Sequence, residues 1–326
     1  MFRTRQAPSP TGFLHLGTAR TMLFTLLFAR SQQGIWYLRC DDTDRKRLQP
    51  ESFMNLLKCM ESLGIMPDEG LSLDKTGFKD SFYGAYQKGE FGPYIQSERL
   101  KIYHEHAQRM IDQRLAYWTF FDEAEKAELV EIKALTKMPI DYWKETAKTH
   151  TEEEMFMSVE KGLVDPRECA LRFKLKRDKK LKCYDELLGE LEFDLNLEED
   201  FIILKNDGFP SYHLAHLIDD RLMETTLVIR SQEWLPSLAR HWTMFEDYWK
   251  KVPKFLHLPF VLGETGNKKM SKRDGNVNMQ DYLDQGYLPE AILNYLAFLG
   301  WNPGDDKELY LDETDFEVVD FEVVEN

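Results

Sequence analysis

Two short stretches of the sequence combine residue types that could bind phosphate. The first is RQAPSPTGFLHLGTAR at residues 5–20, where prolines flank Ser9 and Gly12 permits a turn. His15 and Gly17 follow, directly before apolar residues at helical spacing. The prolines stiffen an extended segment, so the pattern predicts a strand, a rigid turn and a helix. Such a turn points backbone N–H groups and the positive helix end at one place. An anion site and an ordinary strand–turn–helix connection with a surface histidine are both compatible with these residues alone.

The second stretch is KKMSKRDG at residues 268–275, which places Lys268, Lys269, Lys272 and Arg273 within six positions. A loop of this kind can fold over a triphosphate and bring cations to oxygens that gain charge in the transition state. Alone it could equally be a basic surface loop. Together with the histidine and glycine near the N-terminus, it predicts a nucleotide site.

Composition limits the class of protein. The chain has 326 residues, of which 43% are hydrophobic and 13% aromatic, enough for about two domains with a sizeable core. No window approaches the run of about 20 apolar residues that spans a bilayer, and MFRTRQAPSP lacks an apolar signal core. We therefore expect a cytoplasmic protein without a membrane partner. Four scattered cysteines without a CxxC pair predict neither disulfides nor a Cys-rich zinc site.

The net charge of −15 argues against a general nucleic-acid coat, because phosphate binding relies on Lys and Arg. One segment differs: LRFKLKRDKKLK at residues 171–182 holds seven basic residues and one acid. It could engage a polyanionic partner at one face. A solvated hairpin with exposed lysines explains the same pattern.

The order of predicted elements indicates a doubly wound α/β core. Strands before residue 7 and at 35–40 alternate with helices from residue 18 and over 53–65. A middle block with a helix over 98–113, a strand at 116–121, a Glu/Lys-rich helical stretch and the basic hairpin is interpreted as an insertion. The core is expected to resume with a strand from Phe201, a turn at Asp207-Gly208, an amphipathic helix, a strand TLVIR and a helix from Glu233.

His15-Leu16-Gly17-Thr18 and Lys269-Met270-Ser271-Lys272 match, in the right order, the two signatures of class I aminoacyl-tRNA synthetases. APSPTG, DDTDR, NDGFPSYHLA and VIRSQEW match the glutamyl branch, whereas the glutaminyl branch typically carries Pro-Glu-Pro-Asn in the first turn. The chain thus resembles a glutamyl-tRNA synthetase over nearly its whole length.

The resemblance implies an α/β, doubly wound parallel-sheet (Rossmann-like) catalytic core with an inserted α+β domain and a helical C-terminal stem-contact segment. The expected boundaries are 1–90 and 193–258 for the two halves of the core. Residues 91–192 would form the inserted domain, which binds the acceptor end. Residues 259–326 would carry the KMSKR loop and the start of the stem-contact domain.

For the amino acid, the resemblance implies that Arg5 and Arg230 frame the pocket and that Arg5 pairs with the side-chain carboxylate. An arginine fork suits this task because it binds a carboxylate bidentately and keeps its charge. A glutamine amide would leave donor facing donor. Asp41 would meet the α-ammonium, at a position where bacterial members usually have Glu. The other matching pocket positions are Ser9, Tyr212 and His216. A structural ion pair for the two arginines, and core packing for Tyr212, are the alternatives.

For ATP, the resemblance implies that His15 and Gly17 contact phosphate and adenine, and that Glu233 and Trp234 border the nucleotide. Core packing is the alternative for Trp234. The loop residues Lys269, Met270, Ser271 and Lys272 would bind the triphosphate. The α-carboxylate of glutamate would attack the α-phosphate and release pyrophosphate, and the terminal tRNA hydroxyl would then attack the adenylate. Catalysis would come from positioning and from charge stabilisation by His15, Lys272 and Mg²⁺.

Two departures from the family pattern matter. Thr119 and Phe121 stand where many bacterial relatives have zinc-binding cysteines, so we expect no zinc and no metal site in the protein itself. The family also continues into a helical anticodon-binding region, which this chain lacks, as a truncated piece or a short natural form would.

The sequence therefore predicts a glutamate–tRNA ligase catalytic part, a monomer whose partners are L-glutamate and tRNA(Glu). One alternative is the short paralogue that glutamylates the queuosine base of tRNA(Asp), which also lacks an anticodon domain. KMSKRDG and APSPTG favour the synthetase. Another alternative is an RNA-binding module that has lost catalysis. The joint presence of His15, Gly17, Lys272, Arg5 and Glu233 argues against it.

Overall fold

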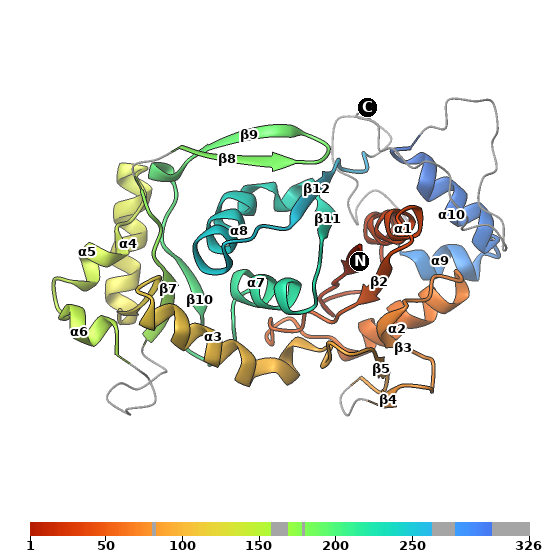
Figure 1. Ribbon diagram of the computed structural model, residues 1–326, viewed down its shortest axis with the longest axis horizontal. Coiled ribbons are helices and arrows are strands. Elements are labelled where there is room, and N and C mark those ends of the chain that lie inside the picture. The colour runs from red at the N-terminus through yellow and green to blue at the C-terminus, as the bar shows by residue number, and fades with distance from the viewer. Residues whose placement is uncertain (80–82, 158–168, 178–179, 263–277, 302–326) are drawn as a thin grey trace.

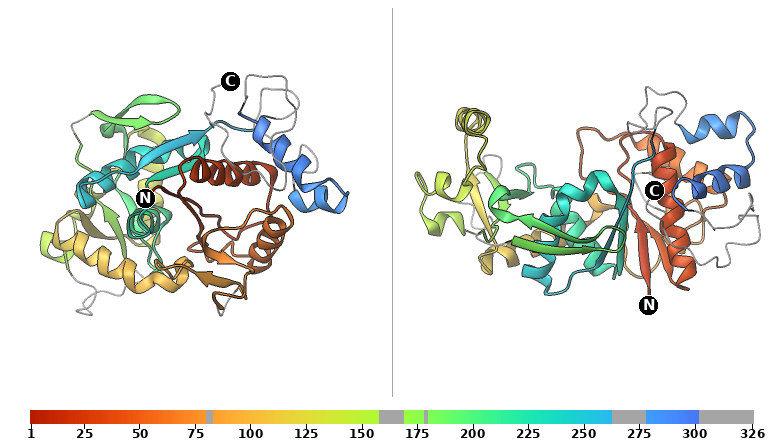
Figure 2. Two further views of the ribbon diagram at one scale, coloured as in Figure 1. Left: turned by 45° about the vertical axis from the view of Figure 1, so that its right-hand side comes forward. Right: turned by 90° about the horizontal axis from the view of Figure 1, so that it is seen from above.

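The structure is a computed structural model that describes residues 1–79, 83–157, 169–177, 180–262 and 278–301. Figure 1 shows an elongated molecule with the parallel strands near its middle, and Figure 2 places α4, α5 and α6 at one end and α9 and α10 at the other. None of the helices in the described ranges combines the length and apolar character needed to cross a membrane.

The central strands form two sheets that meet at β1 and β11. One sheet has the order β1-β2-β3-β5-β4, in which β1, β2 and β3 are parallel. Its strands are β1 (Arg3–Gln6), β2 (Ile35–Leu38), β3 (Glu69–Ser72), β4 (Phe78–Lys79) and β5 (Tyr86–Lys88). On the other side, β11 (Leu227–Ser231) pairs in parallel with β12 (Lys254–Leu258). The Thr226 N–H donates to the Arg3 carbonyl at 2.9 Å and joins the two sheets. The predicted Rossmann-like arrangement is confirmed.

Local sequence explains the first strand–turn–helix unit. All four residues of β1 are buried, as expected for a parallel strand covered on both faces. The chain turns and enters α1 (Leu16–Ser31) with His15 as N-cap, whose side chain accepts from the Thr18 N–H at 3.3 Å. The predicted helix is confirmed and packs against β1, β2 and β11.

Further helices surround these sheets. They are α2 (Pro50–Ser62), η1 (Gln96–Arg99), α3 (Leu100–Asp112), α7 (Tyr212–Leu222), η5 (Gln232–Ser237), α8 (Leu238–Met244), η6 (Phe245–Trp249), α9 (Met279–Asp284) and α10 (Pro289–Phe298). The helix expected from Glu233 begins as the 3₁₀ turn η5, which contains Pro236, and becomes α-helical only in α8. Two apolar cores result, one around α1 and β2 and the other around α7 and β12.

A separate antiparallel sheet lies at the end of the molecule that holds α4. Its order is β10-β7-β6, with β6 (Ala116–Phe120), β7 (Cys169–Phe173) and β10 (Phe201–Leu204). The flanking helices are α4 (Glu123–Thr136), α5 (Tyr142–Thr146) and α6 (Glu152–Met155). We interpreted Phe201–Leu204 as the return to the core, and that interpretation is wrong, because β10 pairs with β7. The chain re-enters the parallel strands at β11, while the domain boundaries given above remain predictions.

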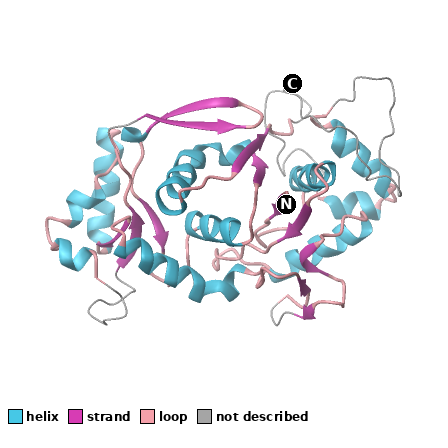
Figure 3. Cartoon of the chain, in the orientation of Figure 1, coloured by secondary structure: helices cyan, strands magenta, loops and turns pink. Residues whose placement is uncertain are grey.

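The basic segment 171–182 does not form the expected hairpin. Its first residues belong to β7, and residues 180–182 begin β8 (Lys180–Asp185), which pairs with β9 (Gly189–Asp194) and β12. Buried residues alternate with exposed lysines along β8, so its apolar face packs inward and fixes this pairing. Figure 3 shows β8 and β9 as the long hairpin along one side of the molecule; the 3₁₀ turn η4 (Leu195–Leu197) follows.

The described cations of this segment have partners within the chain. Arg172 lies 3.5 Å from the ring centroid of Tyr142, and Lys174 lies 3.3 Å from that of Trp143. The remaining pairs are Lys176–Asp247, Arg177–Asp200, Lys180–Glu192 and Lys182–Glu190. These positive charges are therefore engaged inside the molecule.

Candidate active site

One cavity of 1580 Å³ gathers most of the predicted site residues. It opens at the carboxyl ends of β1 and β11, where strand order reverses and where ligands of α/β sheets commonly bind. The predicted residues that line it are Arg5, Ser9, His15, Gly17, Asp41, Tyr212, Arg230, Glu233 and Trp234. Segments more than 200 residues apart in sequence thus meet at one surface, as between Arg5 and Asp220.

The turn after β1 brings His15 and Gly17 to the start of α1. His15 lies at the start of α1, with its Nε2 3.0 Å from the Thr18 hydroxyl. A Cβ on Gly17 would lie 3.5 Å from the His15 ring, so the missing side chain keeps this surface open. The Met279 N–H donates to the Leu14 carbonyl at 2.9 Å, which ties the start of α9 to this turn. Lys269, Met270, Ser271 and Lys272 lie outside the described residues.

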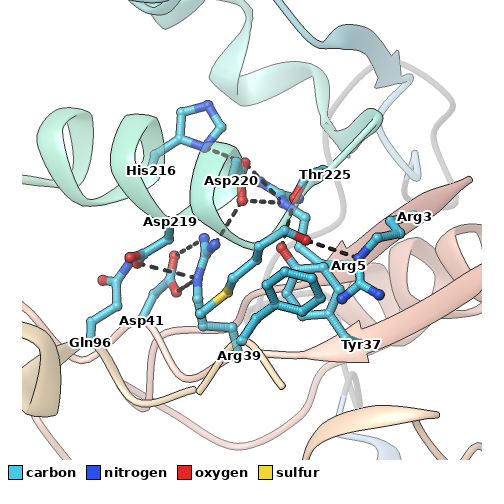
Figure 4. A network of polar contacts seen from close by, with 12 residues as sticks. Arg3, Arg5, Tyr37, Arg39, Asp41, Gln96, His216, Asp219, Asp220 and Thr225 are labelled. Atoms are coloured by element: carbon cyan, nitrogen blue, oxygen red, sulfur yellow. Dashed lines mark hydrogen bonds and ion pairs between the residues drawn. The ribbon is translucent and has the colours of Figure 1, made fainter. Parts of the chain in front are cut away.

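Arg5 and Arg39 belong to a buried network of opposite charges (Figure 4). The Arg5 Nε donates to Asp220 at 3.0 Å, and Arg39 donates to Asp41 at 2.6 Å and to Asp220 at 2.7 Å. Asp219 accepts from Arg99 at 2.7 Å. Three carboxylates thus balance three guanidinium groups, and the two arginines hold the pKa of Asp220 well below its usual value against the effect of burial.

Asp41 is the carboxylate of this network that lines the cavity, together with Arg5. Burial raises the pKa of Asp41 to about 6, although Arg39 opposes that rise. Asp41 therefore offers a carboxylate at neutral pH that protonates in mildly acidic solution.

Arg230 lies in β11 in a different environment. Its Nε donates to His257 Nε2 at 2.9 Å, and its Nη1 donates to the Tyr212 hydroxyl and to His241 Nδ1, both at 3.0 Å. Within the described part of the chain no carboxylate comes within 4.0 Å of this guanidinium, and its buried Nη2 has no hydrogen-bond partner. Burial lowers the pKa of Arg230. A buried cation with neutral hydrogen-bond partners and an unused donor favours an anionic ligand.

The aromatic residues divide between the cavity and the layer behind it. Trp234 is 38% exposed and lies 4.5 Å from the Tyr212 ring, so simple core packing does not describe it. His216 is fully buried, does not line the cavity, and stacks behind Tyr212 with a ring separation of 5.5 Å. Its Nδ1 lies 2.7 Å from Asp220. His216 therefore lies behind the cavity and contacts Tyr212, Asp220 and His241 rather than a ligand.

Comparison with known proteins agrees with this site. A family model described as "tRNA synthetases class I (E and Q), catalytic domain" matches residues 1–325. The chain belongs to this synthetase family. It is 39% identical over 310 residues to a glutamate–tRNA ligase of Alkaliphilus metalliredigens, and 38% identical over 308 residues to one of Clostridioides difficile. Each alignment covers 94% of this chain and 60% of the relative.

Solved structures extend the agreement. A glutamate tRNA ligase from Elizabethkingia meningosepticum, in complex with its amino acid, superimposes with a TM-score of 0.80 at 34% identity. The match covers 95% of this chain and 62% of that one. The chain thus spans about 60% of the length of these synthetases.

Thr119 and Phe121, at the positions where the resemblance implies cysteines in zinc-binding members, make other contacts. Thr119 donates its hydroxyl to the Ala170 carbonyl at 3.0 Å. Phe121 packs in a small apolar cluster with Leu129, Ile140 and Tyr142. No group of three potential ligands is found among the residues that the structure describes. The absence of zinc remains a prediction.

Sequence reasoning missed several residues of the site. Arg39, Asp219 and Asp220 form the centre of the ion-pair network, and His241 and His257 hold Arg230. Arg39 gave one usable signal, because a charged residue inside the apolar strand IWYLRC needs a buried partner.

Proposed function

We propose that the chain is the catalytic part of a glutamate–tRNA ligase, which activates L-glutamate with ATP and transfers it to the 3′ end of tRNA(Glu). The observation that supports this proposal most is Arg230, a buried guanidinium at the cavity with neutral partners and an unused Nη2. The site favours an amino acid with an anionic side chain, and relatives named glutamate–tRNA ligase share the fold.

Arg230 would bind the side-chain carboxylate of glutamate. We expected this role of Arg5, but the Arg5 guanidinium pairs with Asp220. Glutamine would present an amide N–H₂ to the donors of Arg230 and leave the buried cation without a countercharge, which favours glutamate. Asp41, 5% exposed at the cavity, would meet the α-ammonium. The two charges of the pocket then match the two ends of one amino acid.

ATP would lie at the first turn of α1. His15 would donate to phosphate oxygens, Gly17 would allow close approach of the adenine ring, and Trp234 would border the nucleotide together with Glu233. Lys272 and its loop neighbours would stabilise the triphosphate. Mg²⁺ is commonly held by substrate phosphates and water with one or two carboxylates, so it needs no dedicated protein cluster, and it would neutralise phosphate charge.

The reaction needs no protein nucleophile. The glutamate α-carboxylate attacks the α-phosphate, the bond to the bridging oxygen breaks and pyrophosphate leaves. A terminal hydroxyl of the tRNA then attacks the carbonyl carbon of the adenylate and releases AMP. The chain's own contribution is to hold the two substrates in line and to exclude water.

The acceptor end would enter from the side of the three-stranded sheet. The cavity extends to β6 and β7, and its lining includes the cations Arg45, Lys46, Arg47, Lys126 and Lys205. Positive groups at the entrance of an acidic protein suit a phosphate backbone guided to one place.

The test is ATP-dependent transfer of labelled glutamate, with labelled glutamine as control, to purified tRNA(Glu) and to queuosine-containing tRNA(Asp). Nuclease mapping should find the label on the terminal adenosine of tRNA(Glu), and mild alkali should release it. Label on the queuosine of tRNA(Asp) would establish the paralogue reaction instead. Binding of tRNA without transfer to either would point to a module without catalysis.

A further inference from the structure

Asp185 and His257 form a buried pair behind Arg230, and two strand pairings fix their positions. His257 in β12 lies opposite Arg230 in β11, and Asp185 at the end of β8 lies opposite Phe255 in β12. Asp185 Oδ2 is 2.7 Å from His257 Nδ1, and both side chains are fully buried. Asp185 Oδ1 accepts the N–H groups of Leu187 and Leu188 at 3.1 and 3.0 Å, so the turn after β8 holds the carboxylate in place.

The donors and acceptors of this chain of contacts can be assigned in only one way. An ionised carboxylate only accepts, so the His257 Nδ1 must carry the proton. In a neutral ring Nε2 is then an acceptor, and it faces the Arg230 Nε–H at 2.9 Å, which only donates. Burial lowers the pKa of His257 and the contact with His257 helps to lower that of Asp185, so both charge states agree with this assignment. The other tautomer, or the imidazolium, would set donor against donor.

We propose that Asp185 and His257 are positioning residues that hold the Arg230 guanidinium in place for the side-chain carboxylate of glutamate; this inference rests on the proposed function. Asp185 fixes the tautomer of His257, and His257 fixes the Nε edge of Arg230. The carboxylate stands one imidazole ring away, so it orients the cation without neutralising it as a direct ion pair would.

The other hydrogen-bond partners of Arg230 do not contact its Nε. Tyr212 and His241 both contact Nη1, whereas His257 is the Nε contact among the described residues. Loss of the His257 acceptor therefore frees one whole edge of the guanidinium.

The experiment compares D185N, H257Q and the double variant by isothermal titration of L-glutamate into the full chain. In D185N the amide N–H₂ faces His257 and favours the other tautomer, so the affinity for glutamate should fall about tenfold or more. In H257Q the glutamine carbonyl can still accept from Arg230, so the loss should stay below about threefold. Without an imidazole to orient, D185N should add little in the H257Q background.

A second readout follows the tautomer itself. Imidazole ¹⁵N–¹H correlation spectra should show His257 protonated at Nδ1 in the wild-type chain and at Nε2 in D185N. Should D185N not fold, H257L replaces it: an isobutyl group cannot accept, so H257L should lose glutamate binding about tenfold while H257Q keeps it.

The outcomes separate the two proposals. A D185N variant that binds glutamate within twofold of wild type, equal losses in H257L and H257Q, or His257 protonated at Nε2 in the wild type would each overturn the positioning role. A wild-type chain that shows the Nδ1 tautomer but binds no glutamate would overturn the proposed function. The spectra of the wild type and D185N would then still test whether Asp185 fixes the tautomer of His257.

Discussion

Two groups of buried arginines flank the same cavity, one on β1 and β2 and the other on β11. Arg5 and Arg39, with Arg99, meet Asp41, Asp219 and Asp220 directly and form a balanced network. Arg230 meets two imidazoles and a phenol hydroxyl. Burying a charge is costly unless an opposite charge is near, so the first group uses its charge within the protein. The second keeps its charge for a ligand, and the difference separates arginines whose charge stabilises the fold from the arginine that we propose to bind glutamate.

The largest expected effect distinguishes the two groups by stability. R39M removes a fully buried cation and leaves three carboxylates with too little positive charge, so the free energy of unfolding should fall by about 3–5 kcal/mol. The matched variant R230M removes a cation whose partners are neutral and should lose only about 1–2 kcal/mol. Urea unfolding followed by circular dichroism measures both. Equal losses in the two variants would show that the groups do not differ in this way.

Glutamate binding, unlike stability, should depend strongly on Arg230. R230Q should weaken binding of L-glutamate by about 10–100-fold, because it removes a charge-assisted hydrogen-bond donor. R45Q is the control, since Arg45 also lines the cavity but is partly exposed and already pairs with the carboxylate of Asp42. Titration calorimetry should find R45Q within about twofold of wild type. A similar loss in both variants would remove Arg230 from its proposed role.

The pH dependence of glutamate binding should follow the first group. Because the pKa of Asp41 is raised to about 6, protonation below that pH removes the negative charge that attracts the α-ammonium. Affinity should therefore be flat from pH 7 to 8 and fall about tenfold by pH 5. His213 and His216, whose pKa values burial lowers to about 3 and about 4, stay neutral over this range. D41N should bind glutamate weakly at every pH, without the fall in affinity toward pH 5. A D41N profile that still falls would show that another group titrates.

The smallest effect concerns one acceptor of Arg230. Y212F removes the hydroxyl that lies 3.0 Å from Nη1, but His241 still accepts from the same nitrogen. We expect the free energy of glutamate binding to weaken by about 1 kcal/mol, which lowers the affinity about fivefold, with little change in melting temperature. A loss as large as that of R230Q would mean that Tyr212 itself carries the recognition.

Local signals in the sequence predicted the elements at the site, but the sequence did not predict which distant segments pair with one another. The prolines around Ser9 and the periodicity after His15 act over a few residues, so the turn and α1 were predicted correctly. The segment 171–182 and the strand at Phe201 were misread because strand partners depend on sheets assembled from distant parts of the chain. The sequence indicated that arginines would be buried, but it did not indicate their partners. Asp220 lies 215 residues from Arg5, and Asp185 lies 72 residues from His257.

The ion-pair network also sets an order of events during synthesis. Arg5 and Arg39 reach their common partner Asp220 across 215 and 181 residues. Until Asp220 has left the ribosome, both guanidinium groups sit in apolar strands without that partner, and burying them is unfavourable. The first strands can therefore complete their buried ion pairs only after residue 220 has been made, and contacts of such large sequence separation also slow folding. A nascent chain of this kind depends on being kept from aggregation while it waits.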